Sequence, residues 1–412
     1  MKSKLFLAAF ICAAGAQLNL DAADWPRWRG ADLSDHCRET GLLKSWPAGG
    51  PSRLWTSRDV GLGYSSYAVV DGALFTMGLV GEDEQVIAVS AGNGRKLWAT
   101  TIGSRYKNGW GDGPRATPTV DGGRVYAMSG NGDLACLEAK NGRKLWSASM
   151  TELGGKRPGW GYCESVLVDG NLVVCTPGGA KGAMAAFDKA TGKLVWQCKD
   201  WTDGAQYSSI VPTEINGTRQ YVQLTQKSLV GVSAKDGKLL WQSDWQGRTA
   251  VIPTPIIHGN EVYIASGYGV GCKKVRVNKD WSVDDVWVNK VMKNHHGGVI
   301  LHDGYLYGYS DGPGWVCQSW ATGEEVWSER SAFRKGAIYF ADGKFILLEE
   351  QTGNVALIDA SAKGWNEISR FKLAPQSGQR SPKGKVWTHV VISGGKMYLR
   401  DQELLHCYDV KG

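Results

Sequence analysis

Short clusters of polar and aromatic residues recur along the chain, and each precedes a tight turn. Examples are GWGDGPR (109–115), GWGYCES (159–165) and NHH (294–296). Charged, imidazole and aromatic side chains gathered in one place could bind a ligand through charge, hydrogen bonds and ring stacking. The twelve candidate ligand-binding residues are Trp110, Asp112, Arg115, Trp160, Tyr162, Glu164, Tyr207, His295, His296, Lys335, Trp387 and His389.

If these side chains converge on one point, they form a polar pocket that suits a planar, anionic or sugar-like ligand. Three of the seven histidines belong to the set, and neutral imidazoles with Glu164 could instead hold a metal ion. A hydrated channel mouth without a specific ligand would contain the same residue types. The equivalent positions ahead of other turns are Tyr64, Ser65, Ser66, Gln206, Ser208, Arg248, Thr249 and Pro253. The pattern assigns no catalytic residue and no definite metal site.

The turns that follow these clusters belong to a repeated unit. Residues 116–150 read as four short stretches in which apolar residues mostly alternate, which is typical of half-buried strands. The stretches are separated by Asp121-Gly122, Asn131-Gly132 and Asn141-Gly142. Such dipeptides favour two-residue hairpins, because a type I′ turn needs a positive φ at both positions. The unit is therefore predicted to be a four-stranded antiparallel meander.

The unit recurs along most of the chain. Its last strand carries a tryptophan at intervals of 40 to 50 residues, namely at Trp98, Trp146, Trp196, Trp241, Trp287 and Trp327. Eight first-hairpin turns mark eight units: Asp71-Gly72, Asp121-Gly122, Asp169-Gly170, Asn216-Gly217, Gly259-Asn260, Asp303-Gly304, Asp342-Gly343 and Gly394-Gly395. Four strands at this spacing are the signature of propeller blades, so we predict an all-β, eight-bladed propeller.

The two ends of the chain complete the count. The sequence stops after LLHCYDVKG, which reads as a third strand without a fourth, while PSRLWTSRDV presents Trp55 on a lone strand. We therefore expect the strand around Trp55 to complete the last blade and remove two exposed sheet edges. In the seventh unit the last strand is ISRFKL, with Phe371 expected at the tryptophan position.

One repeat fits the motif A-x-D-x-x-T-G-x-x-x-W fully, through Ala186, Asp188, Thr191, Gly192 and Trp196. This motif resembles the repeat of PQQ-like propellers, the quinoprotein alcohol dehydrogenase-like superfamily, and the chain is similar to the BamB-type outer-membrane assembly factors. The resemblance implies that each tryptophan packs between neighbouring blades. The structural docking residues would then be Trp55, Trp98, Trp146, Trp196, Trp241, Trp287 and Trp327.

The N-terminus predicts export. Lys2 and Lys4 precede an apolar stretch over residues 5–16, which is the pattern of a signal peptide that we place at residues 1–23. Ile11 stands before Cys12 where a lipidation signal needs a small residue, which argues against a lipoprotein anchor. Residues 24–50, with DWPRWRG, would form an N-terminal arm, and residues 51–412 the propeller. No later stretch is long and apolar enough to span a bilayer.

Two functions are open at this point. The first is a binding or scaffold module of the periplasm or cell envelope, with envelope proteins or a small polar ligand as partners. The second is a quinoprotein dehydrogenase that oxidises an alcohol or sugar with pyrroloquinoline quinone (PQQ) and Ca²⁺. In it, Glu164 or Asp112 would ligate the ion, and Arg115 or Lys335 would pair with quinone carboxylates.

Binding is favoured over redox chemistry, because the large alcohol dehydrogenases of this class carry adjacent cysteines and this sequence has no Cys-Cys pair. The net charge of +7 includes no basic run, so nucleic acid is not an expected partner. Nine cysteines are present, and their pairing does not follow from the sequence.

Overall fold

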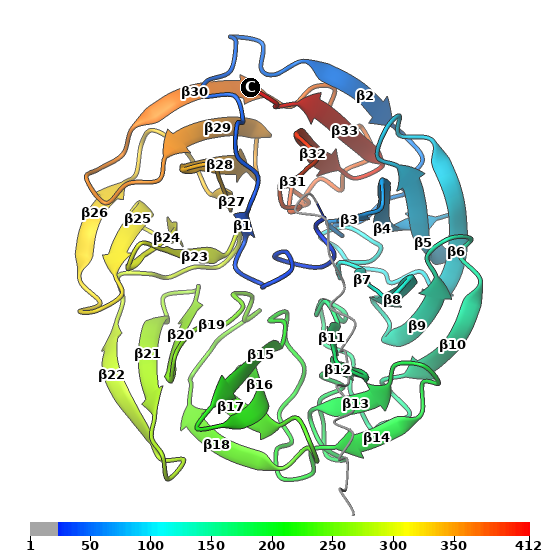
Figure 1. Cartoon of the computed structure of the whole chain (residues 1–412), viewed down its shortest axis with the longest axis vertical. Coiled ribbons are helices and arrows are strands. Elements are labelled where there is room, and N and C mark those ends of the chain that lie inside the picture. The colour runs from blue at the N-terminus through cyan, green and yellow to red at the C-terminus, as the bar shows by residue number, and fades with distance from the viewer. Residues whose placement is uncertain (1–23) are drawn as a thin grey trace, which may run out of the picture.

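The computed structural model describes residues 24–412, so the expected signal peptide at residues 1–23 lies outside the described residues. The described chain forms eight antiparallel sheets around a central axis (Figure 1). The predicted all-β, eight-bladed propeller is confirmed. Between residues 24 and 412, nothing long and apolar enough to form a membrane-spanning helix is found.

Blades one to four each contain four consecutive strands. They are β3 (Ala68–Val70), β4 (Ala73–Val80), β5 (Asp83–Ser90) and β6 (Lys96–Ser104); β7 (Thr119–Asp121), β8 (Arg124–Met128), β9 (Asp133–Glu138) and β10 (Lys144–Ser149); β11 (Leu167–Asp169), β12 (Leu172–Cys175), β13 (Ala185–Asp188) and β14 (Leu194–Gln197); and β15 (Val211–Ile215), β16 (Thr218–Leu224), β17 (Ser228–Ser233) and β18 (Leu239–Asp244). The first strand of each blade is the innermost and the fourth is the outermost (Figure 1).

Blades five to seven follow the same plan, and blade eight takes its outer strand from the N-terminal side. They are β19 (Ile256–His258), β20 (Glu261–Ser266), β21 (Gly271–Val277) and β22 (Val283–Asn289); β23 (Val299–His302), β24 (Tyr305–Ser310), β25 (Gly314–Ser319) and β26 (Glu325–Glu329); β27 (Gly336–Ala341), β28 (Lys344–Glu349), β29 (Asn354–Asp359) and β30 (Glu367–Lys372); and β31 (Val391–Ser393), β32 (Lys396–Asp401), β33 (Leu404–Asp409) and β2 (Arg53–Ser57).

The ring closes between its two ends. Strand β2 pairs antiparallel with β33, so that Trp55 lies opposite Cys407 in the last blade. The predicted closure is confirmed. The first hairpin of blade one has the expected turn, because Asp71 and Gly72 both adopt positive φ, at 50° and 72°.

A fully buried arginine joins the closing blade to blade one. Arg400 in β32 is 0% exposed and donates hydrogen bonds to six oxygens. They belong to Gln402, Ser65, Thr76, Met77, Val60 and Gly61, at 2.6 to 3.2 Å. Burial lowers its pKa to about 10, so the group remains charged at neutral pH. The last blade is therefore held by this polar contact as well as by strand pairing.

The outer-strand tryptophans lie between neighbouring blades. Five of them donate Nε1–H to a backbone oxygen of the next blade: Trp98 to Ala139, Trp146 to Lys189, Trp196 to Ala234, Trp287 to Trp320 and Trp327 to Ser361. Trp241 instead donates to Gln220 of its own blade, at 2.5 Å. Trp55 lies against Gly94 of blade one, but its Nε1 is buried without a partner in the described structure.

Blade seven departs from the predicted register. In the other blades the tryptophan sits at the β-bulge of the outer strand, as Trp98 does opposite Ala88. In β30 the residue at the bulge is Ser369, opposite Leu357, so the assignment of Phe371 to the tryptophan position is wrong by two residues. Blade seven therefore has no tryptophan at its bulge, and a tryptophan of the arm packs beside this position. Trp46 donates its backbone N–H to Ser369 Oγ and packs edge-on against Phe371.

The tryptophan contacts predict a measurable difference between two glycines of blade two. Gly142 and Gly122 both have positive φ, but a methyl group on Gly142 would lie 2.5 Å from Trp98 Cε3, whereas Gly122 has nothing within 4 Å. We expect Gly142→Ala to be less stable than Gly122→Ala by about 1 to 3 kcal/mol, because both share the backbone strain and only one displaces an indole. Denaturant titration of the two variants measures the difference, and equal midpoints would contradict it.

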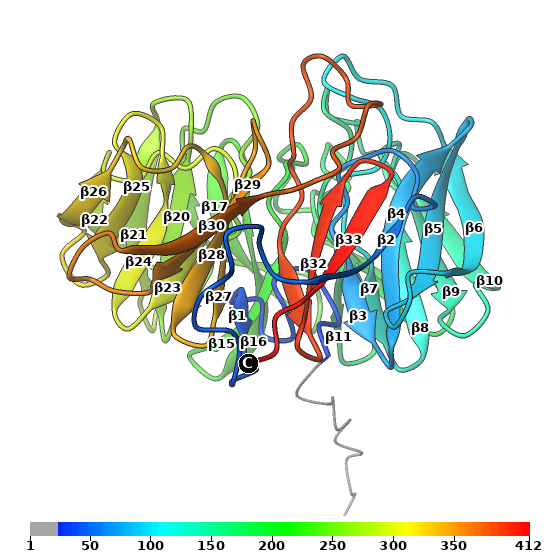
Figure 2. The ribbon, with the colours of Figure 1, turned by 90° about the horizontal axis from the view of Figure 1, so that it is seen from above.

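The N-terminal arm runs across the inner strands at one end of the channel. Trp25 of the arm exchanges two backbone hydrogen bonds of 2.8 Å with Val69 of β3, and the carbonyl oxygen of Pro26 accepts the N–H of Val120 in β7. Farther along, β1 (His36–Cys37) pairs in parallel with β27 of blade seven. The arm therefore passes through the middle of the ring (Figure 1) and lies on the opposite side from the tall β30–β31 loop (Figure 2).

Candidate functional site

A cavity of about 380 Å³ lies at the centre of the ring, a size within the range of small-ligand pockets. Its floor includes two arm residues, Trp28 and Arg29. Trp28 donates Nε1–H to Thr254 Oγ1 (3.3 Å), and Arg29 donates Nη2–H to Val299 O (2.9 Å). The arm thus closes one end of the channel, and the cavity is blind.

Eight of the twelve candidate residues line this cavity. They are Trp110, Arg115, Trp160, Tyr207, His295, His296, Trp387 and His389, with Tyr64, Ser66 and Thr249 from the equivalent positions of other blades. Strand alternation explains which residues face inward, because successive side chains in an extended chain point to opposite sides. Cys163 and Ser165 line the cavity, whereas Tyr162 and Glu164, which alternate with them along the chain, point into the blades.

The other four candidate residues lie outside the cavity lining. Asp112 accepts the N–H of Asn108 (2.8 Å) and pairs with Arg105 (3.6 Å), so it holds its own loop. Tyr162 is buried and donates to Pro177 O (3.0 Å). The positions of these four residues do not support the expectation that they contact a ligand in the cavity directly.

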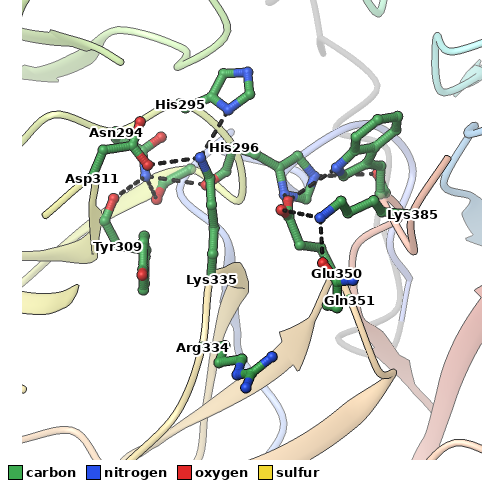
Figure 3. Close-up of polar contacts among 12 residues, drawn as sticks. Asn294, His295, His296, Tyr309, Asp311, Arg334, Lys335, Glu350, Gln351 and Lys385 are labelled. Atoms are coloured by element: carbon green, nitrogen blue, oxygen red, sulfur yellow. Dashed lines mark hydrogen bonds and ion pairs between the residues drawn. The ribbon is translucent and has the colours of Figure 1, made fainter. Parts of the chain in front are cut away.

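Lys335 stands one layer behind the wall of the cavity. Its Nζ is 2.8 Å from both His295 Nδ1 and Asp311 Oδ1 (Figure 3). Burial, followed by the charge of Lys335, lowers the pKa of His295 to about 4, so this imidazole is neutral at pH 7. Lys335 therefore positions His295 and its charge is already paired with Asp311.

A second polar group supports the neighbouring wall. Glu350 accepts Trp387 Nε1–H (3.0 Å) and lies 3.4 Å from His296 Nδ1 and 3.7 Å from Lys385 Nζ (Figure 3). Burial opposes ionisation of Glu350, but the bonds from His296 and Trp387 and the charge of Lys335 lower its pKa to about 2. Glu350 lies in the turn of the second hairpin of blade seven, between β28 and β29, a position that the sequence argument did not consider.

Glu164 is buried and faces away from the cavity. Its Oε2 accepts Thr176 N–H (2.7 Å), whereas Oε1 has no partner in the described structure. Burial raises its pKa to about 8. The imidazoles therefore do not share a metal site with Glu164, and among residues 24–412 no three His, Cys, Asp or Glu side chains are grouped to hold a metal ion.

The raised pKa of Glu164 predicts a pH-dependent stability. The folded state holds a proton here that the unfolded state releases near its ordinary value of 4.5, so stability falls as pH rises from about 4.5 to about 8. We expect Glu164→Gln, which keeps the acceptor for Thr176, to gain stability over the wild type at pH 8.5 and much less at pH 5. The exposed Glu152→Gln variant is the control, and a pH-independent difference would contradict the expectation.

The cavity does not fit a quinone centre with Ca²⁺. Calcium takes six to eight oxygen ligands, usually including carboxylates. No aspartate or glutamate is among the described residues that line the cavity, and Asp112 and Glu164 are engaged elsewhere. What the cavity offers is stacking surface and hydrogen-bond donors.

The arrangement of blades and cavity can be compared with known proteins. A family model described as "Outer membrane protein assembly factor BamB" matches residues 82–329. The chain belongs to this family. No curated protein matches the sequence closely enough to count as a relative of this BamB-family chain.

Solved structures share the fold at low sequence identity. BamB from Moraxella catarrhalis is 14% identical, with 81% of this chain and 94% of that chain covered and a TM-score of 0.56. The quinohemoprotein alcohol dehydrogenase ADHIIG from Pseudomonas putida HK5 is 13% identical, with 95% and 81% covered and a TM-score of 0.64. The computationally designed Ika8 protein is 11% identical, with 87% and 100% covered and a TM-score of 0.58. These likenesses show the fold of the BamB-family chain.

Proposed function

We propose that this BamB-family chain is an exported binding module of the periplasm or cell envelope that holds a small polar ligand in its central pocket. The observation that carries the proposal is the blind, aromatic-walled cavity. Four tryptophans line it, and the arm supplies its floor. Indole faces in a concave site with a few polar groups are typical of small-molecule pockets. Family membership supports export and envelope proteins as partners. The proposal carries no lipid anchor, because Ile11 stands before Cys12 where a lipidation signal needs a small residue.

The second candidate is a PQQ-dependent dehydrogenase, which the shared fold with ADHIIG brings forward. The absence of a carboxylate among the described lining residues argues against it, because the Ca²⁺ that accompanies the quinone needs charged oxygen ligands. Dye-linked oxidation of an alcohol or sugar by protein mixed with PQQ and Ca²⁺ tests this candidate. Turnover with a bound-quinone spectrum would replace the binding proposal.

The binding proposal is tested through its own tryptophans. Protein labelled with 5-fluorotryptophan is titrated with glucose, glucuronate, benzoate, and PQQ with Ca²⁺, and the ¹⁹F signals are assigned by Trp→Phe variants. We expect at least one probe to shift the signals of Trp28, Trp110, Trp160 and Trp387, which line the cavity, and to leave that of Trp365, outside it, unchanged. Folded protein in which no probe moves a pocket signal would overturn the proposal.

A further inference from the structure

Arg115 is a half-buried cation that forms no ion pair with any residue of the described part of the chain. Its guanidinium donates to the backbone oxygens of Gly111 (2.7 Å) and Gly113, and it lies over the rings of Tyr64 and Tyr106, at 5.3 and 4.8 Å from their centroids. Within residues 24–412 it forms no salt bridge, and its charge partly offsets the effect of burial, which raises the pKa of Glu84. An arginine held by carbonyls and rings keeps its charge available to an anion.

The carboxylates near the cavity are already engaged. Glu350 is bound by Trp387 and lies close to His296, and Asp311 is bound by Lys335. Glu84 accepts the backbone N–H groups of Tyr106 and Gly130, at 3.1 and 2.7 Å. Since the described lining contains no acidic residue, the charge that a ligand meets there is positive.

Three serine hydroxyl groups line the cavity, contributed by blades one, three and four. Ser66 Oγ accepts the N–H of His389 (2.9 Å), Ser165 Oγ that of Thr117 (2.9 Å), and Ser209 Oγ that of Ser165 (3.1 Å). Each hydroxyl bridges two blades as an acceptor, and within residues 24–412 its own hydrogen has no acceptor. Three donors spaced around the cavity suit a ligand with several oxygen atoms around a ring.

The walls add the apolar faces of aromatic rings. Trp160 stacks with Tyr207 at 5.5 Å and 23°, and its Nε1 is buried without a partner in the described structure. Trp28 meets His389 edge-on at 4.4 Å. His389 is 8% exposed, and its buried Nδ1 is also unpartnered within residues 24–412.

We propose that the ligand is an acidic monosaccharide of the hexuronate class, an inference that rests on the proposed pocket function. Its carboxylate pairs with Arg115, its hydroxyls accept from the serine hydroxyls, and its C–H face lies on the indoles. A neutral sugar leaves the arginine without its anion. A planar aromatic acid places an apolar edge against the serine donors, which then remain unsatisfied.

The inference is tested by calorimetric titration with glucuronate, glucose and benzoate. We expect glucuronate to bind at least roughly tenfold more tightly than either of the others, and more weakly as salt is raised. Arg115→Gln should weaken glucuronate binding roughly 10- to 100-fold and leave glucose binding unchanged. Arg143→Gln, which removes an exposed arginine of blade two, is the matched control and should change neither.

The outcomes separate the two proposals. Glucose binding equal to that of glucuronate, or full glucuronate affinity in Arg115→Gln, overturns the acidic class but leaves the pocket function standing. Benzoate binding as tight as that of glucuronate overturns the sugar class alone. If no probe binds while circular dichroism shows folded protein, both proposals fall. Should Arg115→Gln not fold, Arg115→Lys replaces it, and its full retention of the preference for glucuronate shows that charge, without the guanidinium fork, is enough.

Discussion

Replacing Arg400 with methionine is expected to destabilise the protein by about 4 kcal/mol or more. The change deprives six oxygens of their donor, five of them in the segment from Val60 to Met77 that joins blade one to the last blade. Buried acceptors left without partners cost about 1 to 3 kcal/mol each before relaxation. Chemical denaturation, with the midpoint compared at constant slope, measures the loss.

The matched control for Arg400 is Arg143→Met. Arg143 is exposed and, within residues 24–412, pairs only with Glu138 of blade two, so its loss should change stability by less than about 0.5 kcal/mol. Arg400→Lys keeps the charge but offers one nitrogen in place of three, and should also be strongly destabilised. An Arg400→Met protein as stable as the control would show that strand pairing alone closes the ring.

The second large effect concerns the arm. Arg29→Met should release residues 24–37 from the channel and raise the open population of the arm on the order of 100-fold, or about 3 kcal/mol. Arg29 Nε lies 3.2 Å from Asp35 Oδ2, and both side chains are almost fully buried, at 2% and 3% exposure. Burial raises the pKa of Asp35 to about 6 even though the charge of Arg29 lowers it. Without Arg29, the buried Asp35 carboxyl group has no positive charge to offset the cost of its burial.

Chymotrypsin cleavage after Trp28 under native conditions reports this opening, when closing is fast relative to cleavage. The control is Arg38→Met, because Arg38 carries the same charge in the same segment but is 70% exposed in its pair with Asp32. The double variant Arg29→Met/Asp35→Asn should open less than Arg29→Met alone. Equal cleavage of the Arg29 and Arg38 variants would contradict the expectation.

The fold could be predicted because its signals are local. Each Asp-Gly or Asn-Gly turn and each outer-strand tryptophan lies within one blade, and the missing strand of the last blade pointed to Trp55. The contribution of Arg400 could not be predicted, since its partners in blade one are more than 300 residues away in sequence. The assignment of Phe371 to the tryptophan position was wrong because a sequence motif does not reveal the β-bulge that places Ser369 opposite Leu357.

The lining of the cavity was predicted in outline and missed in detail. The residue clusters ahead of the first hairpins indicated the mouth of the channel, but the prediction did not distinguish which residues of each cluster face the axis. Strand alternation would have separated Ser165 from Glu164, because only every second side chain faces the axis. Tyr268 lies in a second hairpin, and Trp28 and Arg29 lie outside the repeat, so no periodicity pointed to them. Two tryptophans and two arginines within DWPRWRG were the one signal for the arm.

The central claim is that the arm forms the floor of a blind pocket, and amide hydrogen exchange of residues 24–37 tests it most directly. Trp25 and Val69 exchange paired backbone hydrogen bonds of 2.8 Å, so both amides should exchange as slowly as those of strand β8. Exchange of Trp25 at the rate of an unstructured peptide, with β8 still protected, would show that the channel is open at both ends.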